Sequence, residues 1–450
     1  MKSIIIPQNY KSIIHKIYIT AIENKFNVYI AGGFVRDLLI NREPKDLDIM
    51  VCGGKSEADR RLAGINFSKI LANKYTLSSP ILFEKFGTSK LFLDNKEIEF
   101  VMPRKEYYDA NSRNPYTQIA PLKQDALRRD FTINALFLRL SDMKILDFTR
   151  QGIKDIENKI IRVTDTANAE TIFKQDPLRV LRAMRQSLQL NFKIEPQTFS
   201  AMEKSASRIK IVSPERIRDE INKILTAKNP SKTFILMLKI NLLNNILPGL
   251  QKLKQTGKYS VDNAFAHTMK VIDSTRNDII LRMAVLMHGI ARYSKCEKSC
   301  VKNIKEIKLI LGRLKYSKEF IKRTASIIQN SIYTKIYSSN WTDGMVRKFA
   351  KKCGNELDLT MDFLRAYYAK NDNRIKINEL KKRIEDLKSK NILYNNPILT
   401  GKEIIKIFNN PAGKWIQNAK NKVEEIQLEN PRLTKEQAIK IVEDMLNKQE

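Results

Sequence analysis

Cysteine is scarce in this sequence, and long apolar runs are missing. The four cysteines form no paired framework, and Cys296 and Cys300 have no second cysteine or histidine pair at zinc spacing beside them. We therefore expect free thiols in a reducing compartment. No apolar run is long enough to cross a membrane, and Pro7 interrupts the apolar residues near the start, so no signal peptide is predicted. A soluble, cytoplasmic protein without membrane association is expected.

Acidic residues are the second shortage. The 450 residues include 49 Asp and Glu against 81 Lys and Arg, which gives a formal net charge of +32. Such an excess of cations favours a polyanionic partner, with nucleic acid as the first candidate. A solvated, lysine-rich surface explains the composition equally well, so composition alone leaves both interpretations open. The length allows two to four domains with a large core.

The most informative stretch lies between residues 28 and 51. An apolar run at 28–31 predicts a short strand, and Gly32 and Gly33 follow it. Glycine allows the backbone to turn sharply and to approach a ligand closely. A short helix is predicted at 34–40, and the start of a helix favours a bound phosphate group.

A second strand is predicted over residues 45–51, and it carries two acids, Asp46 and Asp48. Residues two apart in a strand face the same side. Neighbouring carboxylates repel each other unless a cation lies between them, and Mg²⁺ prefers a few carboxylate oxygens together with phosphate oxygens. With Arg36 in the preceding helix, the stretch combines a phosphate turn, an arginine and a metal-binding pair.

This combination resembles the signature of the polymerase-β-like nucleotidyltransferases. More narrowly, it resembles the class II group of tRNA CCA-adding enzymes and bacterial poly(A) polymerases. The resemblance implies an α+β protein, in which an N-terminal nucleotidyltransferase head with a mixed sheet and helices precedes an all-helical neck, body and tail. It also implies that Asp46 and Asp48 are catalytic Mg²⁺ ligands, and that Gly32, Gly33 and Arg36 contact nucleotide phosphates.

Two further segments of the head carry predictions, after a helix expected at 57–73. The strand predicted at 96–101 places Glu97 and Glu99 on one face. The family has a third catalytic carboxylate on such a strand, and Glu99 matches it by its apolar flanks. A half-exposed strand with two solvated glutamates is an equally good interpretation. The polar, turn-rich residues 107–121 predict a mobile loop beside the site.

Residues 125–136 predict a helix that carries Arg128, Arg129 and Asp130. The charged first turn of an ordinary helix would give the same pattern. The segment resembles the second motif of the family, which implies that Arg129 contacts the nucleotide phosphates and that Asp130 accepts a hydrogen bond from the ribose 2′-OH. Such an acceptor favours ribonucleotides over deoxyribonucleotides.

A third motif begins at residue 175. Asp176 and Pro177 predict the cap and first turn of a helix, and a well-capped basic surface helix is one interpretation. Asp176 and Arg179 are three residues apart and therefore neighbours on the helix surface. A carboxylate accepts hydrogen bonds and a guanidinium only donates them. Together they match the edges of cytosine and adenine and reject uracil and guanine.

The same segment resembles the base-selecting motif Glu-Asp-x-x-Arg of the family. The resemblance implies that Asp176 and Arg179 bind the base and that Arg182 and Arg185 bind the triphosphate. Gln175 stands where the family usually has glutamate. A glutamate would hold Arg179 by charge, and a glutamine holds it more weakly. We therefore expect looser base selection and an unchanged reaction.

Later motifs have a structural or a degenerate character. Residues 213–220 resemble the fifth motif of the family, which braces the neck, and we expect a structural role. His267 and His288 resemble the histidines of an HD metal-phosphohydrolase site, but Gly289 replaces the essential aspartate. Without that carboxylate ligand, a helical body without hydrolase activity is predicted.

Two glycine turns near the C-terminus each lead into a predicted helix, and the second contains Gly413 and Lys414. Such turns can present backbone N–H groups to phosphate. They resemble the family's tail, which grips the outer corner of tRNA, and so imply RNA binding; plain turns between helices explain them equally well. The predicted domains are the catalytic head (1–150), the base-recognising neck (151–225), the degenerate HD-like body (226–340) and the tRNA-binding tail (341–450).

The leading hypothesis is template-independent addition of CCA to the 3′ end of tRNA. It uses CTP and ATP, needs Mg²⁺ and releases diphosphate by two-metal nucleotidyl transfer. A poly(A) polymerase, or an enzyme that adds only A or only CC, would use the same motifs. A non-catalytic RNA-binding protein is the hypothesis from another class, and the intact Asp46, Asp48, Arg36 and Arg129 argue against it. The sequence carries no signal for the oligomeric state.

Overall fold

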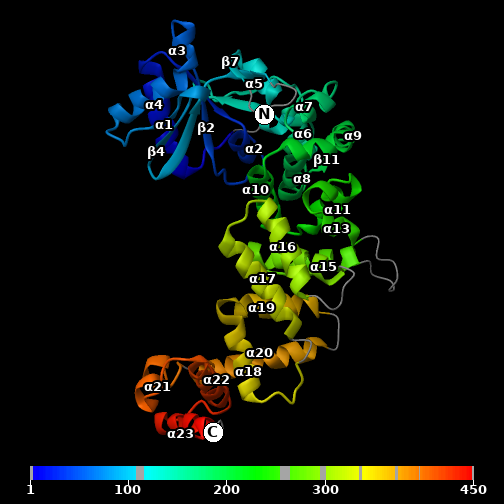
Figure 1. Cartoon of the computed structure of the whole chain (residues 1–450). Helices are drawn as coiled ribbons and strands as arrows, with labels where there is room; N and C mark the ends of the chain where they lie inside the picture. The colour runs from blue at the N-terminus through cyan, green and yellow to red at the C-terminus, as the bar shows by residue number, and fades with distance from the viewer. Residues whose placement is uncertain are drawn as a thin grey trace. The chain divides into compact units, whose positions relative to one another are not determined.

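The protein divides into two compact units, Met1–Pro248 and Gly249–Glu450. The computed structural model describes residues 4–107, 116–253, 264–293, 300–333, 337–369, 373–394 and 396–447. Figure 1 traces the chain from the strands and helices of the first unit to the helices of the second. The finer division into head, neck, body and tail stays a prediction.

A seven-stranded sheet with the order β3-β4-β5-β2-β1-β8-β9 forms the framework of the first unit. Strands β2 and β5 run parallel, and the other neighbours are antiparallel. The predicted mixed sheet is therefore confirmed (Figure 1). The strands are β1 (Asn27–Ala31), β2 (Leu47–Cys52), β3 (Ile81–Phe83), β4 (Thr88–Leu93), β5 (Lys96–Val101), β8 (Leu136–Arg139) and β9 (Ile145–Asp147).

Two helices, α1 (Gln8–Glu23) and α4 (Ala63–Lys74), cover one face of this sheet. Phe67 of α4 packs on Phe100 of β5 with ring centroids 5.6 Å apart. Helix α4 lies so close to β5 that a Cβ added at Gly64 would be 2.8 Å from the carbonyl oxygen of Phe100.

The prediction of a single helix at 57–73 is wrong, because two helices occupy this segment. The first, α3 (Glu57–Arg61), is an exposed five-residue helix closed by a capping box between Ser56 and Asp59. The second, α4, begins at Ala63 and is buried against the sheet. Leu62 lies outside helical geometry between them, which lets the exposed turn and the buried helix take different directions.

The opposite face of the sheet is partly covered by α5 (Leu122–Arg128). Ala126 of this helix packs in a cluster with Ala31, Met50 and Phe137 of the sheet. Because side chains alternate along a strand, Asp48 lies on this same face of β2 as Met50. The sheet therefore has one face covered by α1 and α4 and one face that leaves acidic side chains beside a cavity.

The helix predicted over 125–136 is also wrong beyond its first turn. Helix α5 ends at Arg128, and Arg129 is extended, with φ −63° and ψ 166°. A short 3₁₀ turn at Thr132–Asn134 follows, and then β8, which pairs with β1. The pairing of β8 in the sheet overrides the local helical pattern.

The loop expected at 107–121 forms part of a hairpin. Strands β6 (Arg104–Tyr107) and β7 (Tyr116–Ile119) pair antiparallel, and the rest of the predicted loop, 108–115, lies outside the described residues. The buried Asp125 accepts a hydrogen bond from the backbone N–H of Arg104, 3.2 Å away, and so ties the first strand of the hairpin to α5.

The rest of the first unit is mainly helical. A short parallel pair, β10 (Ile160–Ile161) and β11 (Lys193–Ile194), interrupts the neck that was expected to be entirely helical. Helix α8 packs against α10. The remaining helices are α2 (Gly33–Leu39), α6 (Gly152–Glu157), α7 (Ala169–Gln175), α8 (Leu178–Leu190), α9 (Pro196–Ser205), α10 (Pro214–Leu225), α11 (Ser231–Lys239), α12 (Leu243–Ile246) and α13 (Pro248–Lys252), which spans the unit boundary.

In its described residues the second unit consists of helices and turns. Its helices are α14 (Ala264–Ser274), α15 (Ile279–Tyr293), α16 (Cys300–Arg313), α17 (Lys318–Tyr333), α18 (Asp343–Cys353), α19 (Leu357–Tyr367), α20 (Asn373–Ser389), α21 (Gly401–Phe408), α22 (Lys414–Glu429) and α23 (Lys435–Leu446). Across the described parts of the chain, no helix combines the length and apolar character needed to cross a bilayer. Cys52 and Cys353 are free thiols, as expected, and Cys296 lies outside the described residues.

Candidate active site

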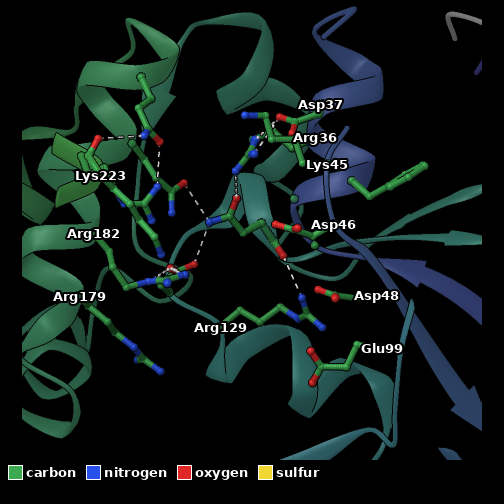
Figure 2. A pocket seen from close by; sticks show the side chains of 18 of the residues that line it. Arg36, Asp37, Lys45, Asp46, Asp48, Glu99, Arg129, Arg179, Arg182 and Lys223 are labelled. Carbon is green, nitrogen blue, oxygen red and sulfur yellow. Dashed lines mark hydrogen bonds and ion pairs between the residues drawn. The ribbon is translucent and has the colours of Figure 1, made fainter. Parts of the chain in front are cut away.

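A cavity of about 1140 Å³ opens beside the acidic face of the sheet, within the first unit. Figure 2 shows Asp46, Asp48 and Glu99 on one side of it, and Arg179 and Arg182 on the other. The site residues predicted in the head and neck all line it: Gly32, Gly33, Arg36, Asp46, Asp48, Glu99, Arg129, Asp130, Asp176, Arg179, Arg182 and Arg185. Gly413 and Lys414 belong to the second unit, where Gly413 directly precedes α22.

The acidic group rests on the parallel pairing of β2 with β5. In this register Asp48 lies directly opposite Glu99. The sequence predicted Asp46 within the strand, but β2 begins at Leu47, so Asp46 precedes the strand by one residue. It still lines the cavity. Burial, the Glu99 charge and, to a smaller extent, Asp46 raise the pKa of Asp48 to about 6, against the lowering effect of Arg129. The ionised acids therefore repel one another at neutral pH.

These acids are the part of the cavity that fits a divalent metal ion. Among the described residues, no three or more histidine, cysteine or acidic side chains come close enough to form a metal site by themselves. Mg²⁺ needs fewer protein ligands, because it is commonly held by one or two carboxylates together with water and substrate phosphates. Asp46 and Asp48 supply hard oxygen donors whose mutual repulsion a cation would relieve.

The predicted glycine turn brings the backbone close to an arginine. Gly32 has a φ of +73°, a conformation that side chains rarely adopt, and a Cβ there would lie 2.9 Å from Nη1 of Arg129. The N–H of Gly32 donates to the carbonyl oxygen of Leu136 at 3.0 Å, which ties the turn between β1 and α2 to the first residue of β8. Glycine is therefore required at this position for close packing and for its backbone conformation.

A chain of hydrogen bonds joins the head residues to α8. Arg36 donates from Nη1 to Oδ1 of Asn134 at 2.7 Å, and its Nε and Nη2 contact Asp37. Asn134 donates in turn to Asp130 at 2.9 Å and to Gln186 at 3.0 Å. The sequence analysis missed Asn134; its spacing of four residues from Asp130, within the second motif, was the available signal.

Asp130 is buried, and both oxygens of its carboxylate have partners. Oδ1 accepts from the N–H of Phe131 and from Asn134, both at 2.9 Å, and Oδ2 accepts from Nε of Arg182 at 2.8 Å, while Nη2 of Arg182 lies 2.6 Å from the same oxygen as an ion pair. Although burial alone would raise the pKa of Asp130, Arg182 and Asn134 hold it well below its usual range. A carboxylate has about four acceptor positions. With three of them in use, a ribose hydroxyl would have to share Oδ2 with the Arg182 guanidinium.

Arg129 is held by a second buried acid, Asp125, which the sequence analysis did not select. Its Nε donates to Asp125 at 3.1 Å, its Nη1 donates to the carbonyl oxygen of Asn134 at 3.3 Å, and its guanidinium carbon lies 4.9 Å from the ring centroid of Phe137. Arg128 contacts the other oxygen of Asp125 at 2.6 Å. Asp125 thus orients both arginines of the second motif.

Asp176 caps α8 and also contacts the fifth motif. Its Oδ1 accepts from the N–H of Leu178 at 3.2 Å, while Pro177 already has helical dihedrals. Its Oδ2 accepts from Nη2 of Arg216 at 2.9 Å. The capping role agrees with the sequence, whereas the contact with Arg216 was missed, because residues 213–220 were expected to serve only as a brace.

Arg179 is held by backbone oxygens. Its Nη2 donates to the carbonyl of Arg128 at 2.7 Å, and its Nη1 donates to that of Ile172 at 3.4 Å. Gln175 is exposed, and across the described residues it makes no hydrogen bond with Arg179. The main chain, and not residue 175, therefore sets the position of this guanidinium.

Arg185 also contacts the fifth motif, through the buried acid Glu220. Its Nε donates to Glu220 at 2.6 Å, its Nη1 donates to Gln189 at 2.8 Å, and Lys223 lies 3.7 Å from the other oxygen of Glu220. Arg182 and Arg185, both predicted to bind the triphosphate, are therefore paired with acids, Asp130 and Glu220 respectively.

Three domain models match successive parts of the chain. Residues 28–162 match the poly A polymerase head domain, and residues 191–254 match a probable RNA- and SrmB-binding site of polymerase A. Residues 299–442 match a domain described as a putative second domain of tRNA nucleotidyltransferases.

Individual proteins show the same likeness. A tRNA nucleotidyltransferase of Schizosaccharomyces pombe is 32% identical over 238 residues, which are 48% of this chain and 47% of the relative. The chain thus spans about half the length of that relative. A mitochondrial CCA tRNA nucleotidyltransferase of Candida glabrata is 26% identical over 497 aligned positions, with 93% of this chain and 90% of the relative covered.

Among solved structures, the fold is similar to that of the Bacillus stearothermophilus CCA-adding enzyme in complex with CTP. The TM-score is 0.73 at 20% sequence identity, and 99% of each chain is covered. This likeness supports the α+β architecture with a mixed-sheet head and a mostly helical remainder.

Proposed function

We propose that this chain, which belongs to the family of class II tRNA nucleotidyltransferases and bacterial poly(A) polymerases, adds CCA to the 3′ end of tRNA. The observation that carries the proposal is that one cavity holds two sets of groups. Asp46, Asp48 and Glu99 supply the carboxylates of a nucleotidyl transfer site, while Asp176 and Arg179 supply an acceptor and a donor for a base edge. CTP and ATP would be the nucleotide substrates, and diphosphate the released product.

Asp46 and Asp48 would hold Mg²⁺ at the start of β2, with Glu99 across the ladder as the third carboxylate. Mg²⁺ bound there would supply a lowered pKa for the RNA 3′-OH and neutralisation of phosphate charge. The arginines near the glycine turn, Arg36 and Arg129, would orient the nucleotide phosphates.

The neck would select the base without a nucleic-acid template. The carboxylate of Asp176 only accepts hydrogen bonds, and its pairing with Arg216 orients it. Arg179 uses two N–H groups on backbone oxygens, and a guanidinium has five. The remaining donors can meet the ring-nitrogen acceptor that both cytosine and adenine present. Uracil and guanine would place a carbonyl against the carboxylate of Asp176.

Three other roles belong to the proposal. Arg182 and Arg185 would contact the triphosphate after exchanging part of their pairing with Asp130 and Glu220, and Asp130 would then be free to meet the ribose 2′-OH. In the second unit, the exposed turn at Gly413 and Lys414 would contact the tRNA.

The same cavity would serve a poly(A) polymerase or an enzyme that adds only A or only CC, and these are the second candidates. The likeness over almost the whole chain to a CCA tRNA nucleotidyltransferase favours the complete reaction. A non-catalytic RNA-binding protein is disfavoured, because the cavity retains the full set of carboxylates.

Incubation of the full-length protein with tRNA transcripts, with Mg²⁺ and one labelled nucleotide at a time, tests the proposal. Transcripts should end before the first C, before the second C and before A. The expected result is incorporation of two C residues and then one A, with CTP and ATP both needed for completion. Long tails from ATP alone would establish poly(A) synthesis instead. Absence of incorporation from every nucleotide on every transcript would overturn the enzymatic assignment.

A further inference from the structure

Two cations that line the cavity differ from the others. Arg42 and Lys45 are exposed, and their side chains form no hydrogen bond or ion pair with any described residue. Every other arginine or lysine of the cavity already contacts a carboxylate, an amide or a backbone oxygen, as Arg36 contacts Asp37 and Arg182 contacts Asp130. Arg42 and Lys45 are therefore the cavity cations whose side chains have no contact with a described residue for a ligand to compete with.

The backbone that carries these two cations is firmly held. The hydroxyl of Tyr10, a residue that is only 1% exposed, donates to the carbonyl oxygens of Pro44 and Lys45 at 3.2 and 3.3 Å. The ring of Tyr10 packs edge-on against Phe34, with centroids 5.0 Å apart. The N–H of Arg42 donates to the carbonyl oxygen of Asp37 at 2.8 Å. The segment is thus a fixed platform with two unpaired charges, and its backbone would lose little conformational freedom on binding a ligand.

The platform adjoins the proposed reaction centre. Lys45 directly precedes Asp46 in the chain, and Figure 2 places the two beside each other at the carboxylate side of the cavity. Arg42 and Lys45 lie near acids but form no ion pair with any described residue, so their charges do not stabilise the fold in the absence of a ligand. Their arrangement suits an anionic chain that contacts Arg42 and Lys45 while its end reaches the carboxylates near Asp48.

We propose that Arg42 and Lys45 bind a backbone phosphate of the RNA strand whose 3′ end enters the carboxylate site. This inference rests on the proposed function and adds the residues that guide the acceptor strand. Lysine and arginine contacts to phosphate position nucleic acid without reading its sequence. Such a contact would suit a strand that must present three successive 3′ ends to one site.

The phosphates of the incoming nucleotide are a less suitable ligand for this platform. The arginines proposed to bind them, Arg36 and Arg129, adjoin the glycine turn at the N-terminal end of α2. Arg42 and Lys45 follow the C-terminal end of that helix, whose seven residues span roughly 10 Å. The cavity, at about 1140 Å³, is also larger than the ~300–1000 Å³ usual for one small ligand. Two occupants, a nucleotide and an RNA end, account for both observations.

The test is a double variant, Arg42→Gln with Lys45→Gln, measured as the full-length protein on tRNA that lacks its CCA end. We expect the KM for tRNA to rise about tenfold or more, with the KM for CTP and kcat nearly unchanged. The dependence of log KM for tRNA on log salt concentration should become shallower by roughly one for each lost phosphate contact. A matched control, Lys55→Gln with Lys69→Gln, removes two exposed charges of the head outside the cavity and should leave both KM values in place.

A binding measurement separates this inference from the proposed function. Titration of a labelled acceptor-stem RNA into each variant needs no turnover, so weaker binding by the double variant than by the control supports the platform even if the protein adds no nucleotide. A higher KM for CTP with unchanged RNA binding would assign the platform to the nucleotide phosphates and overturn the inference. Equal RNA binding by the double variant and the control would overturn it as well.

Discussion

At the scale of single residues, Asp48 shows how the site sets function against stability. It lies opposite Glu99 in the parallel ladder and is largely buried. Its pKa is raised to about 6, first by burial and then by the Glu99 charge. Since the folded state disfavours the ionised form, stability without metal should fall as the pH rises from about 4 to about 6.

Asp48→Asn should therefore abolish nucleotide incorporation and stabilise the protein. In metal-free buffer at pH 8 the free energy of unfolding should rise by about 1–3 kcal/mol, since one pKa unit corresponds to ~1.4 kcal/mol. Denaturant unfolding at pH 4 and pH 8 measures the free energy of unfolding. In the wild type Asp48 should lower this free energy between pH 4 and pH 8, and the variant should not show that decrease. Incorporation by the variant at a large fraction of the wild-type rate would remove Asp48 from the catalytic site.

Arg216 offers a prediction about base selection, because it holds the carboxylate of Asp176 at 2.9 Å. Arg216→Gln should leave Asp176 less firmly oriented. Discrimination of C and A against U and G should then fall by roughly threefold to tenfold, since a hydrogen bond to a charged group contributes about 1.5–3 kcal/mol, of which glutamine can retain part. The measurement is kcat/KM for all four ribonucleotides on the three tRNA ends.

Arg218→Gln is the matched control for this prediction. Arg218 lies two residues along α10 and pairs with Asp219 outside the cavity. Its loss should leave selectivity unchanged. If both variants slow all four nucleotides equally, with the ratios preserved, Arg216 braces the neck and has no part in base selection.

At the scale of secondary-structure elements, the sequence correctly predicted the elements that local residue patterns determine. The strands at β1, β2 and β5 appear close to their predicted places, because apolar alternation and the glycine turn are local signals. The prediction of a helix over residues 125–136 was wrong because β8 pairs with β1, which is a contact between residues far apart in the sequence. The roles of Asp125 and Arg216 were invisible for the same reason, since each acts on residues brought near by folding.

The close approach of α4 to β5 gives a prediction about packing. Gly64→Ala would place a methyl group 2.8 Å from the carbonyl oxygen of Phe100, and the nearest atoms that it would meet all belong to the backbone of β5. The helix would have to move away from the sheet, at a cost of about 1–3 kcal/mol. Thermal unfolding of the first unit should shift to lower temperature.

Gly312→Ala is the opposite case within α16. A Cβ at this exposed position meets nothing within 4 Å, so the substitution should leave stability unchanged or raise it by about 0.5 kcal/mol through the helix preference of alanine. Unaltered stability of Gly64→Ala would show that α4 can shift freely on the sheet.

At the scale of the whole molecule, the second unit carries two histidines that we predicted, from a resemblance alone, to be the remnant of an HD-like site without hydrolase activity. His267 and His288 each lie 4.9 Å from the ring of Tyr367, in edge-on contact. Gly289 faces Oγ1 of Thr268, which a Cβ would approach to 2.7 Å, and Cδ1 of Leu253 at 3.1 Å. The packing around Gly289 therefore leaves little room for a side chain.

Gly289→Asp, which would supply the aspartate of an HD site, should not produce hydrolysis. The new side chain would meet Thr268 and Leu253, so the second unit should lose about 1–3 kcal/mol of stability. Neither wild type nor variant should hydrolyse phosphate monoesters or cyclic nucleotides with Mg²⁺ or Mn²⁺. Robust hydrolysis that disappears in His288→Ala but persists in Asp48→Asn would contradict this.

The internal pairing of the cavity arginines has a consequence for inhibition. Arg182 and Arg185 are neutralised by Asp130 and Glu220, so a lone sulfate or inorganic phosphate ion would have to compete with a built-in carboxylate at each of them. A triphosphate presents linked charges, and once one phosphate is bound the next meets its arginine at high effective concentration. At these two arginines small anions should therefore bind weakly, and affinity should increase with the number of linked phosphates, which makes that number a recognition signal in its own right.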